Sequence, residues 1–187
     1  MIIYNKSLSV VPLTTHINLR KVPKIIKKNL IITKIRTLNN FYIKYFKVKP
    51  KIAILGLNPH NAEYNKDSEE IKFIKPAISS LKKRFNVSGP YSADTAFGKA
   101  HLKKFNIIVG MYHDQVLAPY KTLFEFNAIN MTLGLPYLRM TPDHGVASDK
   151  KKLNIINVGR YTDQKDQLTI LKAINRIKNK IKLNLLI

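Results

Sequence analysis

The stretch Phe105-Asn106-Ile107-Ile108-Val109-Gly110-Met111 is followed directly by Tyr112-His113-Asp114-Gln115. A continuous apolar run rich in β-branched residues is typical of a strand buried on both faces of a parallel sheet. Parallel strands need helical crossovers, so the stretch indicates an α/β fold. In such folds, ligands bind at the carboxyl ends of the strands, and this predicted strand delivers a histidine there.

Two further apolar runs end in the same way. Residues 8–13 precede Thr14-Thr15-His16, and residues 51–57 precede Asn58-Pro59-His60. We therefore expect His16, His60 and His113 to converge at one edge of the sheet. Imidazole is a common metal ligand, and three protein ligands with one open position are typical of a catalytic metal. Their spacing matches no compact metal motif, so the expectation depends on the fold.

The remaining patterns predict helices between the strands. Pro23 is expected to begin a helix, and Ser68-Glu69-Glu70 introduces a second one that the Gly89-Pro90 pair closes. Residues 126–133 predict a fourth strand, and residues 164–182 an amphipathic helix at the carboxyl-terminal end. No repeat or linker divides the chain, so residues 1–187 are expected to form a single α/β unit.

Composition limits the possible classes of protein. The 187 residues are 45% hydrophobic, which indicates a globular chain, and contain no cysteine. A metal would therefore have nitrogen and oxygen ligands. The amino terminus lacks the pattern of a signal peptide and no apolar run approaches the length of a membrane span, so we expect a cytoplasmic protein without membrane contact.

The net charge of +22 raises the alternative of a basic nucleic-acid-binding protein. Lysine, asparagine and isoleucine are all encoded by A/T-rich codons, and mutational bias toward such codons produces the same basicity. The basic residues are spread along the chain and match no nucleic-acid-binding motif. We treat nucleic acid as an unlikely partner, while a phosphorylated ligand would still be attracted by the positive field.

Several segments, taken together, resemble 4-hydroxythreonine-4-phosphate dehydrogenase, an enzyme family of pyridoxal phosphate (vitamin B6) biosynthesis. They follow the family's order across residues 8–145. The segments are Thr14-Thr15-His16-Ile17-Asn18-Leu19-Arg20, Gly56-Leu57-Asn58-Pro59-His60, Gly89-Pro90 with Ala93-Asp94-Thr95, Met111-Tyr112-His113-Asp114-Gln115, Thr132-Leu133-Gly134-Leu135-Pro136 and Asp143-His144-Gly145.

The resemblance implies an α/β/α fold like that of the isocitrate and isopropylmalate dehydrogenases. It implies NAD-dependent oxidation of 4-phosphooxy-L-threonine, followed by decarboxylation to 3-amino-2-oxopropyl phosphate. It also implies a homodimer with the active site at the subunit interface, and one divalent ion, either zinc, magnesium or cobalt. The family binds NAD without a G-x-G-x-x-G loop, so the absence of that motif here is not evidence against a dehydrogenase.

The family's residue roles transfer by position. They imply metal ligation by His16, His60 and His113, substrate binding by Lys121, Asn130 and Arg139, a catalytic role for Asp94, and cofactor contacts by His144 and Gly145. Asp114 fits a residue that orients His113. Five of these residues have a structural alternative: Lys121 and Arg139 fit solvated surface charges, Asp94 and Asp114 fit loop or cap residues, and His144 fits a turn.

The sequence departs from the family in two places. We expect the chain to lack the family's amino-terminal segment, so that it represents a truncated enzyme or one part of a split enzyme with a separately encoded amino-terminal half. After Gly145 the family has a glycine-containing turn, where this chain reads Val146-Ala147-Ser148-Asp149-Lys150. Lysine fills space that glycine leaves open, which predicts weaker NAD binding. A noncatalytic subunit that retains the fold and the metal site is the alternative.

Overall fold

A computed structural model describes residues 1–125, 127–135 and 139–142. The described strands form one seven-stranded sheet in the order β4-β3-β5-β2-β1-β6-β7. The strands are β1 (Ile2–Tyr4), β2 (Ser9–Pro12), β3 (Ile52–Leu55), β4 (Val87–Tyr91), β5 (Ile107–Gly110), β6 (Ile129–Thr132) and β7 (Arg139–Pro142). Strands β4, β3, β5 and β2 run parallel, whereas β1, β6 and β7 add antiparallel pairs.

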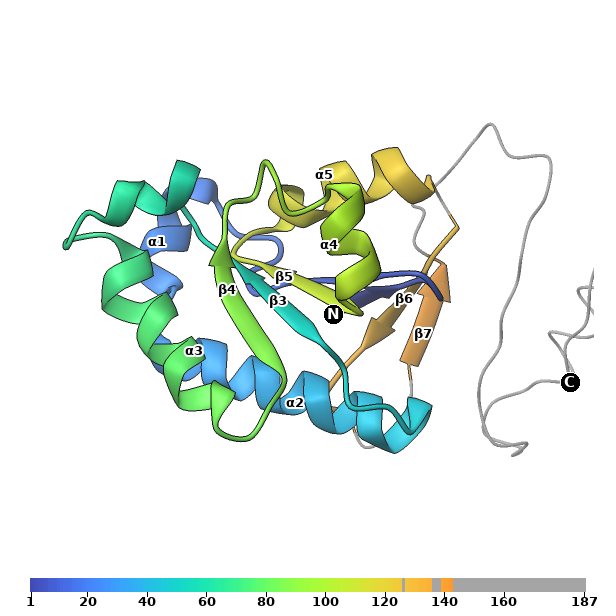
Figure 1. The fold of residues 1–187 in the computed structure, drawn as a ribbon. Coiled ribbons are helices and arrows are strands. Elements are labelled where there is room, and N and C mark those ends of the chain that lie inside the picture. The colour runs from blue at the N-terminus through green and yellow to red at the C-terminus, as the bar shows by residue number, and fades with distance from the viewer. Residues whose placement is uncertain (126, 136–138, 143–187) are drawn as a thin grey trace, which may run out of the picture.

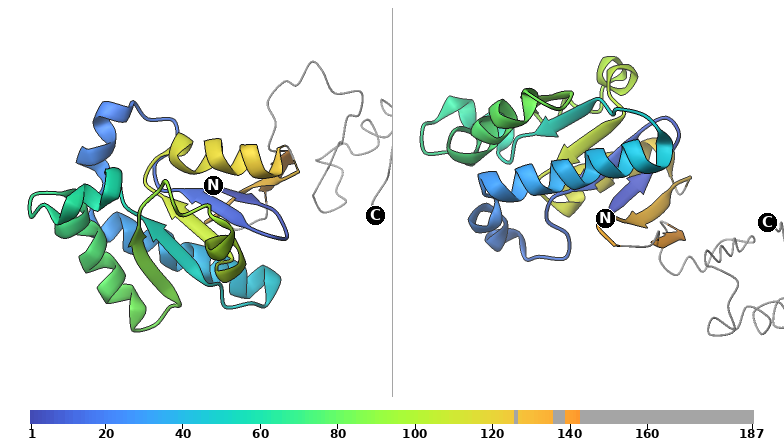
Figure 2. Two further views of the ribbon diagram at one scale, coloured as in Figure 1. Left: turned by 45° about the horizontal axis from the view of Figure 1, so that its top comes forward. Right: turned by 90° about the horizontal axis from the view of Figure 1, so that it is seen from below.

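Helices cover both faces of this sheet (Figure 1). On one face lie α1 (Val22–Ile25), α2 (Lys28–Phe46) and α3 (Lys75–Lys82). On the other lie α4 (Lys99–Lys104) and α5 (His113–Phe124). The described residues also contain the short helical segments η1 (Leu19–Lys21) and η2 (Pro59–Tyr64) and the π-helical turn η3 (Glu70–Ile74). Figure 2 shows the long helix α2 lying across one face of the sheet.

The alternation of side chains along each strand explains why two helical layers are needed. Within β3, Ile52 and Ile54 pack into the core beneath α2 and α3, while Ala53 and Leu55 pack into the core beneath α5. Because side chains on a strand point alternately to the two faces, a strand that is apolar throughout has to be covered on both. Ile108 in β5 likewise faces α5, between two neighbours that face α2. The predicted α/β architecture is therefore confirmed.

The structure corrects two predicted elements. The helix expected to run on from Pro23 is interrupted at Ile26, whose extended backbone (ψ 109°) separates α1 from α2. The buried side chains of Ile26 and Ile31 still face the same core, which is why a single helix fits the spacing. Gly89 and Pro90 do not follow directly on a helix but lie inside the edge strand β4, while the helix ends at Lys82. The predicted helix over residues 164–182 lies outside the described residues.

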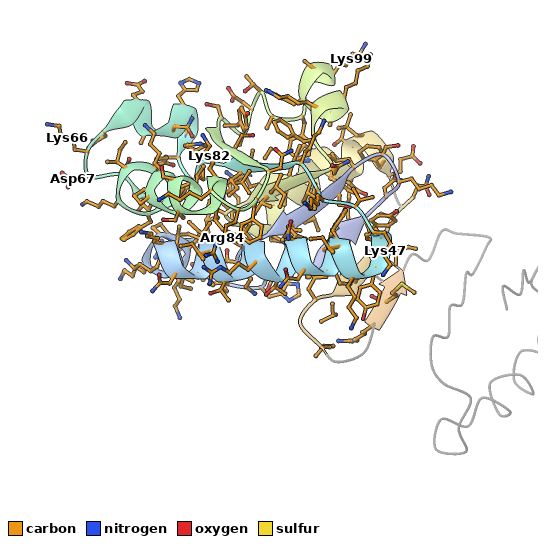
Figure 3. The ribbon with its side chains drawn as sticks, turned by 60° about the horizontal axis from the view of Figure 1, so that its bottom comes forward. Lys47, Lys66, Asp67, Lys82, Arg84 and Lys99 are labelled. Carbon is orange, nitrogen blue, oxygen red and sulfur yellow. The ribbon has the colours of Figure 1, made fainter. Side chains whose placement is uncertain are left out.

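The fourth strand is shorter than the predicted range of 126–133 and spans Ile129–Thr132. Within the described residues, no helix is both long and apolar enough to cross a bilayer. Of the labelled basic side chains, Lys47, Lys66, Lys82 and Lys99 lie at separate points of the molecule, and Arg84 lies in the same region as Lys82 (Figure 3). This arrangement agrees with the dispersed charge seen in the sequence.

Candidate functional site

The four parallel strands end at one edge of the sheet, and a candidate site residue follows each of them. His16 follows β2, His60 follows β3, His113 follows β5 and Asp94 follows β4. The strand order β4-β3-β5-β2 makes the four strands neighbours. The three histidines thus follow neighbouring parallel strands at one carboxyl edge, and Asp94 lies at the same edge. Their convergence on one metal ion stays a prediction.

His16 and His113 lie beside each other. Their ring centroids are 5.7 Å apart with an angle of 45° between the ring planes. His113 is the first residue of α5, and its Nδ1 lies 2.7 Å from Oδ1 of Asp114. A carboxylate at this position selects the tautomer with the proton on Nδ1 and leaves Nε2 as an electron-pair donor. The structure thus brings Asp114 to the histidine that the sequence predicts it to orient.

His60 pairs with the predicted catalytic residue instead. Its Nε2 lies 3.6 Å from Oδ2 of Asp94, and the two side chains are 69% and 59% exposed. His60 lies in η2, where residues 60–63 all have left-handed backbone angles, with φ between 47° and 56°. In the described part of the chain, no group of three histidine or acidic side chains has a geometry that could hold a metal ion. The site therefore consists of two pairs, His16 with His113 and His60 with Asp94.

Glu70 holds the loop that carries His60, and the sequence analysis assigned it no such role. Its side chain is fully buried, and its Oε1 accepts the backbone N–H groups of Leu57 at 2.7 Å and Asn58 at 2.8 Å. Its Oε2 accepts a hydrogen bond from the Asn58 side chain at 3.0 Å. Burial by itself raises the pKa of Glu70, but these hydrogen bonds outweigh it and lower the pKa below the ordinary value.

The sequence contains a pattern that indicates a structural role for Glu70. It lies one helical turn before Ile74, and Ile78 and Leu81 continue the same buried face. A carboxylate on the apolar face of a helix needs partners, because burying an unpaired charge is costly. The pattern alone does not identify those partners, which lie 12 and 13 positions earlier in the chain.

The three predicted substrate-binding residues lie away from the histidines. Lys121 is eight residues after His113 on α5, which corresponds to about 12 Å along the helix axis. Asn130 lies in β6 opposite Ile3, and Arg139 begins β7 opposite Thr132. Strand β1 separates β6 from β2, so two interstrand spacings, about 10 Å, lie between β6 and the His16 strand. The predicted cofactor residues His144 and Gly145 lie outside the described residues.

Imidazole and carboxylate groups at one sheet edge can transfer protons or bind a divalent ion. The fold and this edge define an α/β protein with a candidate active site at the carboxyl ends of its parallel strands. The sequence matches the family described as "Pyridoxal phosphate biosynthetic protein PdxA" over residues 1–163. The chain therefore belongs to this family, which confirms the resemblance found in the sequence.

Individual relatives agree with this assignment. The chain is 41% identical over 179 residues to a 4-hydroxythreonine-4-phosphate dehydrogenase from Sulfurihydrogenibium sp., covering 94% of this chain and 55% of the relative. It is 36% identical to a D-threonate 4-phosphate dehydrogenase from Pectobacterium atrosepticum, covering 80% of this chain and 46% of the relative. The crystal structure of a 4-hydroxythreonine-4-phosphate dehydrogenase from Klebsiella pneumoniae superimposes with a TM-score of 0.69 at 36% identity, covering 79% of this chain and 46% of that one. The chain thus spans about half the length of these relatives.

Proposed function

We propose that the chain carries part of the active site of a 4-hydroxythreonine-4-phosphate dehydrogenase. The proposed reaction is the NAD-dependent and metal-dependent oxidation and decarboxylation of 4-phosphooxy-L-threonine to 3-amino-2-oxopropyl phosphate. One observation carries the proposal: His16, His60, His113 and Asp94 follow four neighbouring parallel strands in a fold of this family. A relative with that name covers nearly the whole chain.

The donor atoms of this edge, which form two separate pairs in the described chain, are of the chemical types that bind zinc, magnesium or cobalt. Imidazole nitrogen suits zinc and cobalt, and carboxylate oxygen is accepted by all three. His16, His60 and His113 are the proposed ligands, and Asp114 holds the His113 ring in a defined tautomer. An ion bound here would lower the pKa of a coordinated substrate hydroxyl. Asp94, beside His60, is the proposed acceptor of the proton from that hydroxyl.

Lys121, Asn130 and Arg139 are the proposed contacts of the phosphorylated amino-acid substrate. Arginine binds phosphate or carboxylate with two parallel hydrogen bonds, and lysine acts as a point charge. Within one chain these residues lie about 10 Å or more from the histidines by the spacing of helix and sheet. This separation supports an active site that is completed by a second copy of the chain, as in the proposed homodimer.

Titration with Co²⁺ tests the metal site, because the visible absorption of the bound ion reports its ligands. We expect binding to the purified chain, and at least a tenfold loss of affinity in each of the variants His16→Ala, His60→Ala and His113→Ala. His101→Ala is the matched control, since His101 packs against Tyr91 and Phe105 and is not a proposed ligand. Equal affinity in all four variants would contradict the assignment.

The relative from Pectobacterium atrosepticum supports a second candidate substrate, D-threonate 4-phosphate. Both candidates are four-carbon carboxylic acids phosphorylated at the fourth carbon, so their binding can be compared by calorimetry on the metal-loaded chain. Tighter binding of 4-phosphooxy-L-threonine would support the first proposal. Metal binding with no turnover of either substrate in the presence of NAD would favour the noncatalytic alternative.

A further inference from the structure

Three side chains bridge the loops at the carboxyl edge, one for each pair of neighbouring parallel strands. Thr14, after β2, donates from Oγ1 to the carbonyl oxygen of Met111, after β5, at 2.8 Å. Gln115, at the start of α5, joins the loops after β5 and β3. Asn61, after β3, contacts from Nδ2 the carbonyl oxygen of Pro90 in β4 at 3.4 Å and Oγ of Ser92, in the loop after β4, at 3.5 Å. All four loops that carry candidate site residues are thereby linked.

Gln115 forms the central bridge and uses both ends of its side-chain amide. Its Oε1 accepts the backbone N–H of Met111 at 2.6 Å, and its Nε2 donates to the carbonyl oxygen of Gly56 at 2.7 Å. Met111 lies two positions before His113, and Gly56 lies four positions before His60. One side chain therefore connects the segments that present two of the three histidines.

The side-chain amide of Gln115 replaces the backbone hydrogen bonds between β3 and β5 at the point where the pairing of these strands ends. The last paired residues of these strands are Ile54 and Val109. Two positions further on, the N–H of Met111 and the carbonyl of Gly56 bond to opposite ends of the Gln115 amide instead of to each other. The bridge thus keeps the two loops one amide group apart while satisfying both backbone groups. The separation of the two loops is set at this point.

The neighbouring backbone is adapted to this side chain. A Cβ atom on Gly110, the last residue of β5, would lie 2.9 Å from Oε1 of Gln115 and 2.5 Å from a methyl carbon of Val116. Glycine inside a strand weakens it and often marks a close approach by another group. The absence of a side chain at Gly110 leaves the room that the Gln115 amide occupies. This pairing is a second observation that supports a defined position for Gln115.

We propose that Gln115 is a positioning residue that sets the spacing between the His60 loop and the His113 end of α5. The inference rests on the proposed function in so far as these histidines bind a ligand. Gln115 acts through the backbone of Gly56 and Met111, and neither of its amide atoms is assigned to the substrate. Replacing a residue that orients metal ligands without contacting the metal itself typically changes the metal affinity by a factor of ten to a hundred.

The variants Gln115→Glu and Gln115→Met separate the two bonds. A glutamate still accepts the N–H of Met111, but its second oxygen faces the carbonyl oxygen of Gly56 and repels it. Methionine has a similar length and removes both bonds. Hydrogen exchange of the amides of Leu57 and Asn58, measured without metal, reports the His60 loop directly. We expect both variants to lose at least tenfold protection there, and at least tenfold affinity for Co²⁺.

Leu117→Ala is the control for stability, because Leu117 is buried on α5 and belongs to the core beneath that helix. It should lower global stability and leave the protection of Leu57 and Asn58, relative to the rest of the sheet, unchanged. The same relative loss of protection and affinity in Leu117→Ala would overturn the proposal, as would unchanged exchange in Gln115→Glu. Loss of protection in the Gln115 variants together with no Co²⁺ binding by the wild-type chain would support the positioning role and contradict the metal site.

Discussion

The carboxylate of Glu70 accepts the backbone N–H of Leu57 at 2.7 Å, and this bond connects the π-helical turn before α3 to the loop after β3. The same oxygen accepts the N–H of Asn58. Two backbone donors that would otherwise be unsatisfied are therefore held by one buried charge. The loop leading to His60 depends on a residue that is not itself a predicted ligand.

Replacing Glu70 should destabilise the fold and the loop together. Glu70→Ala leaves the N–H groups of Leu57 and Asn58 without their acceptor, and we expect the free energy of unfolding to fall by about 2–4 kcal/mol. Glu70→Gln keeps one acceptor oxygen and should cost less. Urea denaturation measures both variants, with the exposed Glu63→Gln as the control. Equal stability of Glu70→Ala and wild type would refute the anchoring role.

Glu70 also predicts an acid dependence of stability. Its pKa is lowered in the folded chain, so the unfolded chain binds a proton first as the pH falls. The stabilisation is complete above the ordinary pKa of 4.5 and is lost as the pH falls below 4.5 through the lowered value. Thermal unfolding between pH 6 and pH 3 should show a smaller loss of Tm for Glu70→Gln than for wild type. A parallel loss in both would contradict the prediction.

Tyr42 predicts the opposite behaviour at alkaline pH. Burial raises the pKa of Tyr42 to about 12 and outweighs the lowering effect of its 2.7 Å hydrogen bond with Oγ of Ser9. Between pH 10 and pH 12 the unfolded chain loses this proton while the folded chain keeps it, so stability should fall over that range by about 2–3 kcal/mol. Tyr42→Phe should remove this part of the loss, whereas Tyr45→Phe, at a residue that is 37% exposed, should not. Denaturation at pH 8 and pH 11 distinguishes the two variants.

Gly110→Ala should disturb the edge of the sheet through a direct steric contact. The added methyl group meets Val116 and Gln115, and crowding of this kind costs about 1–3 kcal/mol. Gly98→Ala serves as the comparison, because its methyl group would meet just the carbonyl oxygen of Thr95, at 3.2 Å. We expect Gly110→Ala to be the less stable of the two by thermal denaturation. The reverse order would show that the space over Gly110 is not filled as described.

The sequence predicted the parallel core of the sheet because its strands are apolar on both faces. The runs that contain β2, β3 and β5 are each followed by a histidine, and parallel order alone brings those ends to one edge. Strand β1 is too short to show a period, and β4 contains the Gly89-Pro90 pair, which is more typical of a turn. Both strands are formed because neighbouring strands pair with them.

The grouping of the site residues was less predictable. His60 lies beside Asp94 because left-handed angles over residues 60–63 turn the chain there, and none of these four residues is a glycine. Helix α5 begins at His113, next to Asp114, a residue type that favours turns, and it contains Pro119, which normally disfavours a helix interior. Packing of Val116, Leu117 and Tyr120 against the sheet outweighs these local preferences.

The antiparallel part of the sheet has a consequence for the order of folding. Strand β1 pairs with β6, and the side chain of Asn5 donates to the carbonyl oxygen of Asn127, 122 positions away, at 2.6 Å. During synthesis on the ribosome, β1 therefore lacks one neighbour until residues 129–132 have emerged, whereas the contacts among β2, β3 and β5 can form earlier. Pairings of such long range slow folding. We expect the β1–β6 pairing to be the late step, after the histidine loops are already in place.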